Sequence, residues 1–377
     1  MANNKDKKIL NVPALRFPEF TGEWERHKLS EVCSFYSGGT PSSSKKEYYN
    51  GNIPFIRSGE LHKDYTELFI TEAGLSNSAA KLVETGDLLL ALYGATSGDI
   101  AISKIKGAIN QAILCIRTKQ DKKFIESVWN KHVERLLQTY LQGGQGNLSS
   151  DIVKNIPFYF ANSEEQDKLA KFISLLDERI ATQNKIIEKL ETLIKGIRHK
   201  VFKQLRKDFG FNSTIGDILS FEQPQRYIVS SAEYSNDDTF IPVLTANKAF
   251  ILGYTTETDG IYDKGDCIII DDFTLDCKYV SFPFKVKSSA IKILTANNKF
   301  ILRYTYEYLK SLELSTEEHK RHYITEIQPY SCVLPDENTL KTIALVFENL
   351  AYKLSNEQSL ALILNKQRQY LLSKMFI

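Results

Sequence analysis

Two acidic residues and a lysine in the second half of the sequence have a spacing that could support metal-dependent hydrolysis. Asp266 precedes Asp276 by ten residues, and Lys278 follows two positions later. Many nucleases hold Mg²⁺ between two carboxylates on adjacent strands and place a lysine beside the attacked phosphate. Such short patterns are common by chance, and Asp271 and Asp272 lie nearby. We therefore favour surface acids on a hairpin, and keep as the alternative a Mg-dependent DNA nuclease or nickase using Asp266, Asp276 and Lys278.

Other patterns of catalysis and metal binding are missing from the sequence. No Gly-x-Gly-x-x-Gly segment, no phosphate loop ending in Gly-Lys-Ser/Thr and no metalloprotease pair of histidines occurs. His319 and His322 are three residues apart, and we interpret them as part of a solvated basic stretch rather than as zinc ligands. The sequence therefore predicts no catalytic residue and no metal ligand.

Residue types suited to DNA contacts gather in loops of the first half. Segment 34–51 combines small residues for close backbone approach, hydroxyls and lysines for phosphates, and tyrosines for packing. Arg57 follows an apolar run and is the type of side chain that pairs bidentately with guanine, while the amides of segment 142–147 can read adenine edges. The predicted DNA-binding residues of this half are Ser37, Gly38, Gly39, Thr40, Lys45, Lys46, Arg57, Tyr93, Gln142, Gln145 and Asn147.

The second half carries a comparable set in its own loops. Its predicted DNA-binding residues are Gln223, Gln225, Arg226, Tyr227, Asn247, Lys248, Lys320 and Arg321. For any one of these residues, ordinary loop chemistry is a sufficient explanation. Their recurrence at corresponding places in both halves favours DNA as the common target.

Two long helix-patterned segments must position these loops, and they are copies of each other. An offset of 174 residues pairs Leu169 with Ile343 and Leu190 with Leu364, and both copies turn polar at the same point of the pattern, at Gln183 in the first. Alternating steps of four and three residues are typical of a coiled-coil seam. We predict that the two helices pack antiparallel through Leu169, Ile173, Leu176, Ile180, Ile187, Leu190, Ile197, Val201, Phe347, Leu350, Leu354, Leu364 and Leu371.

The segments between the helices predict two bodies of mixed structure. Short apolar runs separated by Gly, Pro, Ser and Asn, such as 53–56, 87–93, 100–102 and 112–116, are typical of strands, and 123–141 is typical of a helix. Residues 52–61 and 85–94 resemble residues 240–249 and 264–273, at offsets of 188 and 179. We predict an N-terminal arm (1–28), a first recognition body (29–160), a first spacer helix (161–207), a second recognition body (208–335) and a second spacer helix (336–377). The fold class is α+β, with two mixed α/β bodies separated by a pair of long antiparallel coiled-coil helices in an internal repeat.

Composition limits the class of protein. The chain has 377 residues, 42% hydrophobic and 25% charged, which suffices for two cores of ordinary domain size. A net charge of +2 gives no global polycation, so any basic surface is local. Five scattered cysteines fit a reducing cytoplasm, and no apolar run of 18 residues occurs. We expect a cytoplasmic protein that neither is exported nor spans a membrane.

At the level of whole motifs the chain resembles the specificity subunit of a type I restriction-modification system. The resemblance covers essentially the whole sequence and rests on NVPALRFPEFTGEWERHKLSEV (11–32), YSGGTPS (36–42), NIPFIRSGEL (52–61), GDLLLALYG (86–94), GGQGNLSSDIVKNIPF (143–158) and the long segment 164–202. The second body departs from the pattern: SFEQPQRYIVS (220–230) replaces the glycine-threonine-proline loop, and GGQGN has no counterpart.

The resemblance implies a function without catalysis by this chain. Each body would be a target recognition domain for one half of a bipartite, asymmetric DNA sequence. Two methylation subunits and motor-nuclease restriction subunits would assemble on the chain and bring S-adenosylmethionine, ATP and Mg. The alternatives that remain are the nuclease above and a coiled-coil protein scaffold that binds no DNA.

Overall fold

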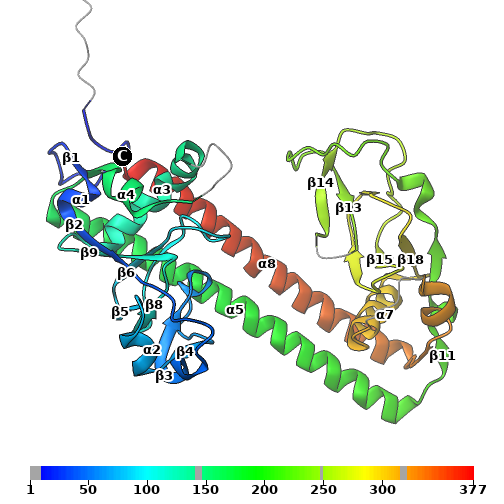
Figure 1. The fold of residues 1–377 in the computed structure, drawn as a ribbon. Helices are drawn as coiled ribbons and strands as arrows, with labels where there is room; N and C mark the ends of the chain where they lie inside the picture. The colour runs from blue at the N-terminus through cyan, green and yellow to red at the C-terminus, as the bar shows by residue number, and fades with distance from the viewer. Residues whose placement is uncertain (1–9, 141–146, 247–248, 315–320) are drawn as a thin grey trace, which may run out of the picture. The chain divides into compact units, whose positions relative to one another are not determined.

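The computed structural model describes residues 10–140, 147–246, 249–314 and 321–377, which form two compact units. The first unit comprises Met1–Gln183 together with Leu360–Ile377, and the second unit comprises Asn184–Ser359. Two long helices, α5 (Ser163–Phe209) and α8 (Glu337–Met375), each contribute to both units (Figure 1). Each unit is described below by itself.

The first unit is built on two four-stranded sheets. One has the order β2 (Cys33–Ser37), β9 (Ile113–Thr118), β6 (Leu88–Ala91) and β7 (Ile100–Ile102), all antiparallel. The other has the order β4 (Phe69–Ile70), β3 (Tyr49–Ile56), β8 (Gly107–Ile109) and β5 (Lys81–Val83), with β3 parallel to β8. All four residues of β6 are buried, because Leu88 and Leu90 face one apolar cluster and Leu89 and Ala91 face another.

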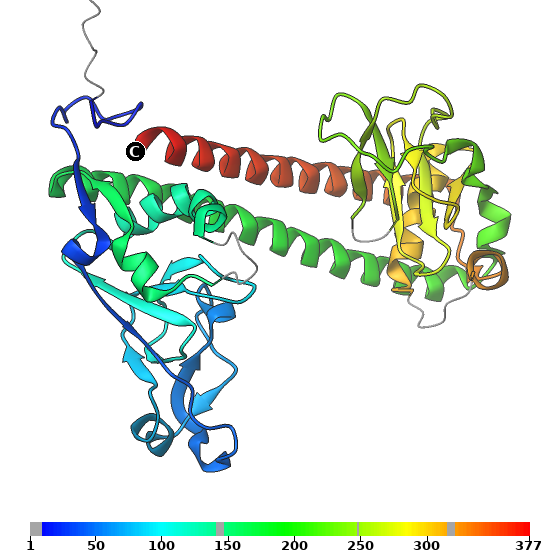
Figure 2. The same cartoon turned by 45° about the horizontal axis from the view of Figure 1, so that its top comes forward.

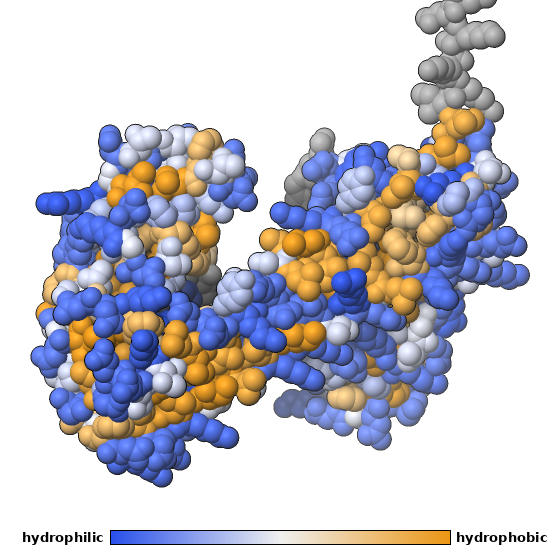
Figure 3. Space-filling view, turned by 180° about the vertical axis from the view of Figure 1, so that it is seen from behind, coloured by the Kyte–Doolittle hydropathy of each residue, from blue (hydrophilic) through white to orange (hydrophobic). Residues whose placement is uncertain are grey.

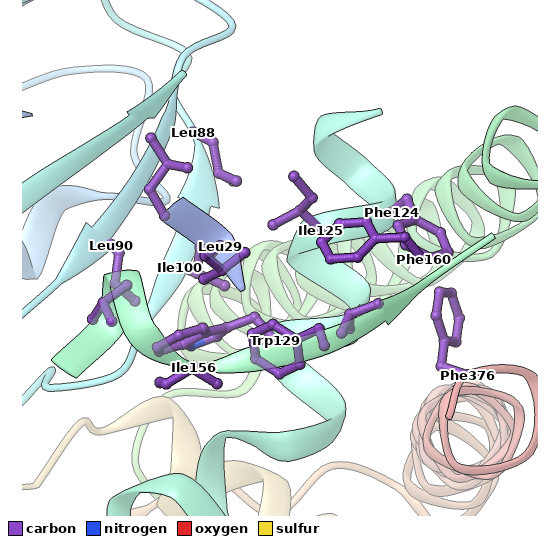
Figure 4. Close-up of a cluster of buried hydrophobic side chains, with 14 of the residues drawn as sticks. Leu29, Leu88, Leu90, Ile100, Phe124, Ile125, Trp129, Ile156, Phe160 and Phe376 are labelled. Carbon is purple, nitrogen blue, oxygen red and sulfur yellow. The ribbon is translucent and has the colours of Figure 1, made fainter. Parts of the chain in front are cut away.

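Helices cover one face of the first antiparallel sheet. The largest of them is α3 (Lys122–Tyr140), whose first turn is capped where the Phe124 N–H donates to Asp121 Oδ1 at 2.8 Å. Smaller elements are α1 (Leu29–Val32), η1 (Lys46–Tyr48), η2 (Ser58–Glu60), α2 (Glu72–Ser76), α4 (Ser150–Asn155) and the pair β1 (Glu25–Lys28) and β10 (Pro157–Phe160). Figure 4 shows the core between α3 and the sheet, where Phe124 meets Phe160 and Phe376.

The second unit repeats this plan, with one strand fewer in its second sheet. Its antiparallel sheet has the order β12 (Ser220–Glu222), β18 (Ile291–Thr295), β15 (Cys267–Asp271) and β16 (Cys277–Val280). A second sheet has the order β14 (Ile251–Thr255), β13 (Ile241–Leu244) and β17 (Lys285–Val286), with β13 parallel to β17 as β3 is to β8. The remaining elements are β11 (Ser213–Thr214), α6 (Ile215–Ile218), η3 (Pro224–Tyr227), α7 (Lys299–Ser311), η4 (Tyr323–Ile327) and β19 (Ser331–Cys332). The predicted fold class and internal repeat are confirmed.

In each unit the contributing parts of α5 and α8 run antiparallel. In the second unit the Gln358 side chain donates a hydrogen bond to Glu191. The ring of Phe202, eleven residues later in α5, stacks on that of Phe347, eleven residues earlier in α8, so the two helices run in opposite directions. In the first unit Asp177 pairs with Arg368, while Leu169 joins the cluster that contains Met375. All thirteen predicted seam positions are buried or half-buried.

Residues 10–28 of the N-terminal arm pack against the rest of the first unit. Figure 2 shows them (blue) beside the end of α8 (red), where the Leu15 N–H donates to Lys374 O at 2.9 Å. The buried carboxylate of Glu165 accepts two hydrogen bonds from Arg16, at 2.7 and 2.6 Å, and one from Trp24 Nε1 at 3.1 Å. Over the described part of the chain, no helix is both long and apolar enough to cross a membrane.

Candidate nucleic-acid interface

At the two glycines of the first candidate loop, contacts within the protein leave no room for a side chain. A Cβ on Gly38 would lie 1.8 Å from Ile109 O, and one on Gly39 would lie 2.5 Å from Ala79 Cβ. The Gly39 N–H also donates to Ile109 O at 3.2 Å, and Thr40 donates to Gln111. The sequence suggested that these glycines allow DNA to approach the backbone closely. In the structure they allow the loop itself to pack closely against β8. Ser37 is half-buried and Thr40 is exposed, so contact of these residues with DNA stays a prediction.

Lys45 and Lys46 offer positive charge beside this loop. Both are exposed, and Lys45 Nζ lies 3.0 Å from the Tyr48 hydroxyl and 5.0 Å from the centre of its ring. This hydrogen bond raises the pKa of Lys45, so the ammonium stays charged. Exposed lysines of this kind suit phosphates, whose contribution to affinity depends on salt.

Arg57 is held by two carboxylates. Its Nε and Nη2 donate to Glu60 at 3.2 and 2.9 Å, and Nη2 also donates to Glu67 at 2.8 Å. Burial alone would raise the pKa of Glu60, but hydrogen bonds from Arg57, Glu67 and Thr66 outweigh it and lower that pKa to about 2. The guanidinium is therefore fixed in direction at the end of β3, as a side chain that reads one base must be. Glu60 is a residue that the sequence analysis missed, although its position three residues after Arg57 was a signal.

The other candidates of the first body differ in exposure. Tyr93 is half-buried and packs against the main apolar cluster. Asn147 is exposed, and the next residue, Leu148, is buried and donates its N–H to Leu92 O at 2.8 Å. Gln142 and Gln145 lie outside the described residues.

In the second body the candidates form an exposed set and a supporting set. Gln225, Arg226 and Arg321 are exposed, and the Arg321 guanidinium lies 5.9 Å from the centre of the Phe273 ring. Tyr227 is a core residue, with its hydroxyl 2.8 Å from Glu222. The remaining candidates Asn247, Lys248 and Lys320, together with His319, lie outside the described residues.

Gln223 is tied to a buried lysine that the sequence analysis did not identify. Its Oε1 accepts a hydrogen bond from Lys292 Nζ at 2.9 Å, and Lys292 also pairs with Asp272 Oδ2 at 3.0 Å. Asp271 and Asp272 are buried, whereas Asp266 is exposed and Asp276 is half-exposed, as expected of surface acids on a hairpin. The signal for this network was a lysine within the apolar strand β18.

One backbone contact of the second body corresponds to a contact made directly after GGQGN in the first body. The His322 N–H donates to Asp272 O at 2.9 Å, just as the Leu148 N–H donates to Leu92 O. Leu92 and Asp272 occupy the same place in the repeat, because their own N–H groups donate to Ala112 O and Ala290 O respectively. Residues 321–322 therefore take the backbone position of residues 147–148, at the offset of 174 that also relates the long helices. Sequence comparison missed this because no side chain is shared.

The residues of the nuclease alternative do not form one site. Asp266 Oδ2 accepts a hydrogen bond from the Tyr279 hydroxyl at 2.7 Å, whereas Asp276 pairs with Lys278 at 3.2 Å and Lys310 at 3.5 Å. The Asp271 N–H donates to Asp276 O, so Asp276 lies beside Asp271. Asp271 is five residues after Asp266 along an extended strand, which separates the backbones of Asp266 and Asp276 by roughly 16 Å. Within the described ranges, no group of three His, Cys, Asp or Glu side chains could hold a metal ion.

Comparison with known proteins shows which family one domain of the chain matches. Residues 21–192 match the type I restriction modification DNA specificity domain. The specificity subunit of the Escherichia coli type I restriction enzyme EcoR124I/EcoR124II is 44% identical over 141 residues, which are 36% of this chain and 35% of that protein. Residues 21–192 therefore carry the DNA specificity domain of type I restriction-modification systems.

Further known proteins are similar to the chain in sequence or in fold. The MjaIX specificity subunit of Methanocaldococcus jannaschii is 27% identical over 241 residues, 55% of each protein. The solved S subunit of the type I restriction-modification system from M. genitalium has a TM-score of 0.67 at 17% identity, covering 97% of this chain and 99% of that chain. This second likeness concerns the fold. The regions matched in the first curated relatives span only 35%, 45% and 55% of their lengths.

Proposed function

We propose that this specificity subunit reads a bipartite, asymmetric DNA sequence, with one body for each half. The observation that carries the proposal is that equivalent backbone positions of the two bodies present different side chains to solvent. Asn147 and Arg321 take the same place beside the sheet, and both are exposed. A shared framework with different contact residues suits two different half-sites, since base contacts specify sequence while phosphate contacts position the protein.

The same proposal assigns the chain an assembly role and no chemistry of its own. Two methylation subunits would bring S-adenosylmethionine, and motor-nuclease restriction subunits would bring ATP and Mg. Support comes from apolar side chains that α8 exposes in the second unit, namely Leu345, Val346 and Tyr352. Figure 3 shows apolar residues reaching the surface on the face that it presents. Exposed apolar surface of this kind is typical of protein interaction sites.

Sequencing of modified bases in DNA from cells that express the chain with a methylation subunit tests the proposal. We expect methylation at one sequence with two half-sites separated by a fixed gap. Exchanging residues 29–160 for the body of a relative should change one half-site and leave the other intact. A change in both half-sites, or a single continuous site, would contradict the modular reading.

Two further assays separate the alternatives. Incubation of the purified chain with plasmid and Mg²⁺ should leave the DNA intact, and cleavage that is lost on Asp276→Ala would support the nuclease. Gel shifts of the complex with a methylation subunit should show binding that is sequence-selective and weakens with salt. Absence of both properties would support a protein scaffold that binds no DNA.

A further inference from the structure

Lys292 is a fully buried lysine at the centre of the second unit's antiparallel sheet. It lies on β18 opposite Ile270 of β15, and these two strands are neighbours in the sheet (Figure 1). Its side chain is 1% exposed and ends in the ion pair with Asp272 and the hydrogen bond to Gln223. Asp272 is buried to the same degree. Burying two charges is costly unless they are paired and hydrogen-bonded, as these are.

The first unit has two leucines at the equivalent positions. Leu90 lies opposite Leu114 on the helix-covered face of its sheet, as Ile270 lies opposite Lys292 on the corresponding face of the second. Leu92 is the equivalent of Asp272, because each residue donates its N–H to, and accepts an N–H from, corresponding backbone positions of its own unit. The pair Leu92 and Leu114 is therefore replaced by Asp272 and Lys292. The shared framework does not need charge at this place.

A stability role does not account for the replacement. Apolar residues in place of a buried ion pair are often neutral or stabilising, so such a pair is weak grounds for stability. What the two charges add is a set of contacts to loops. Asp272 Oδ1 accepts the Tyr323 N–H at 2.8 Å, and Lys292 donates a hydrogen bond to Gln223, the residue directly before η3.

These contacts join segments that are far apart in the sequence. Gln223 is followed by exposed Gln225 and Arg226, and Tyr323 is preceded by exposed Arg321. The three exposed residues are DNA-binding candidates of the second body, and one buried network links the loops that carry them. The leucines of the first body offer no polar side-chain atom for such a link.

We propose that Asp272 and Lys292 are positioning residues that fix η3 and segment 321–323 as one DNA-reading surface in the second body. The proposal rests on the function proposed above. It assigns the selectivity of one half-site to a buried ion pair that touches no DNA. The exposed side chains then read bases from directions set by Gln223 and Tyr323.

The double variant Asp272→Leu/Lys292→Leu transplants the leucine pair of the first body. We expect it to fold with an unchanged or higher denaturation midpoint, and to relax the sequence of one half-site in modified-base sequencing while the other half-site stays intact. The control Asp276→Asn/Lys278→Gln removes the same two kinds of charge from a half-exposed pair of the same sheet, and should leave both half-sites unchanged. Full selectivity in the double variant would overturn the proposal.

A second pair of variants separates positioning from direct reading by Gln223 and does not depend on the double variant folding. Gln223→Glu keeps an acceptor for Lys292 and should preserve the half-site, whereas Gln223→Leu should relax it. Loss of the half-site in Gln223→Glu, or its retention in Gln223→Leu, would overturn the positioning role.

Hydrogen exchange on the purified chain gives a readout without DNA or partners. In Gln223→Leu the backbone amides of 225–227 should exchange faster, and in Asp272→Asn/Lys292→Met the amides of both 225–227 and 321–327 should do so. Unchanged exchange in both segments would overturn the link between them. If the wild type directed no methylation while the exchange results held, the proposed function would fail and the structural link would stand.

Discussion

Glu60 binds the Arg57 guanidinium through both of its carboxylate oxygens, Oε1 at 2.9 Å from Nη2 and Oε2 at 3.2 Å from Nε. The same carboxylate accepts the Arg57 N–H at 3.0 Å and the Thr66 hydroxyl at 3.1 Å. Glu60 is buried, so its charge depends on these donors. One residue thus sets both the loop that follows β3 and the direction of its arginine.

The depressed pKa of Glu60 makes part of the stability depend on pH. Because the folded value of about 2 lies below the unfolded value near 4.5, the ionised group stabilises the fold above pH 4.5, and this contribution is lost as the pH falls towards 2. We expect urea denaturation between pH 6 and pH 2 to show a contribution of roughly 3 kcal/mol that Glu60→Gln lacks. Parallel pH profiles for wild type and variant would contradict this assignment.

Gly38→Ala tests the packing of the glycine loop. Its Cβ would collide with the Ile109 carbonyl, so we expect a loss of about 1–3 kcal/mol in the free energy of unfolding. Gly59→Ala is the control, because a Cβ there meets nothing within 4 Å, and we expect a change within about 0.5 kcal/mol. Urea denaturation measures both. Equal effects would show that the loop can shift away from β8.

Arg16→Ala tests the anchoring of the N-terminal arm. The variant leaves the buried Glu165 carboxylate with Trp24 as its remaining side-chain donor, and we expect a cost of about 3–5 kcal/mol. Lys168→Ala removes the half-exposed ion pair with Glu19 on the same arm and should cost about 1 kcal/mol or less. Scanning calorimetry measures the stability of both variants. A similar loss of stability in the two would contradict the anchoring of the arm by Glu165.

Phe347→Ala tests the antiparallel pairing of the long helices in the second unit. Phe347 is buried and stacks on Phe202, so its truncation should cost about 3–5 kcal/mol. Tyr352→Ala lies on the same helix with its side chain 69% exposed, and should change stability by less than about 0.5 kcal/mol. Thermal unfolding of the full-length chain checks both values. A mild effect of Phe347→Ala would mean that the helices do not rely on this contact.

Periodicity predicted the long elements well and could not predict the polar network of the second unit. The helices expected over 161–207 and 336–377 appear as Ser163–Phe209 and Glu337–Met375, because an apolar seam repeated over many turns is a strong local signal. The helix expected over 123–141 appears as Lys122–Tyr140. Each of these signals is contained within a single stretch of sequence.

The candidate site depends instead on contacts between distant residues. Nothing local indicates that Lys292 meets Gln223, 69 positions earlier, or that Asp272 holds the Tyr323 backbone. The glycines at 38 and 39 were predicted to bind DNA, which stays a prediction, and the structure shows that the close approach of residues 79 and 109 leaves no room for a side chain there. Residue types in the sequence therefore indicated the candidates. Tertiary contacts show which candidates are exposed and which ones hold the loops in place.

The division of the chain between the two units also affects the order in which they can fold during synthesis. The second unit is one continuous stretch that is complete at Ser359, whereas the first unit includes residues from Leu360 onward. Phe376, which packs against Trp24 and Phe124, leaves the ribosome more than 250 residues after Phe124. Since domains fold as units during synthesis, the second unit can close first, and the nascent first unit must wait with part of its apolar core uncovered.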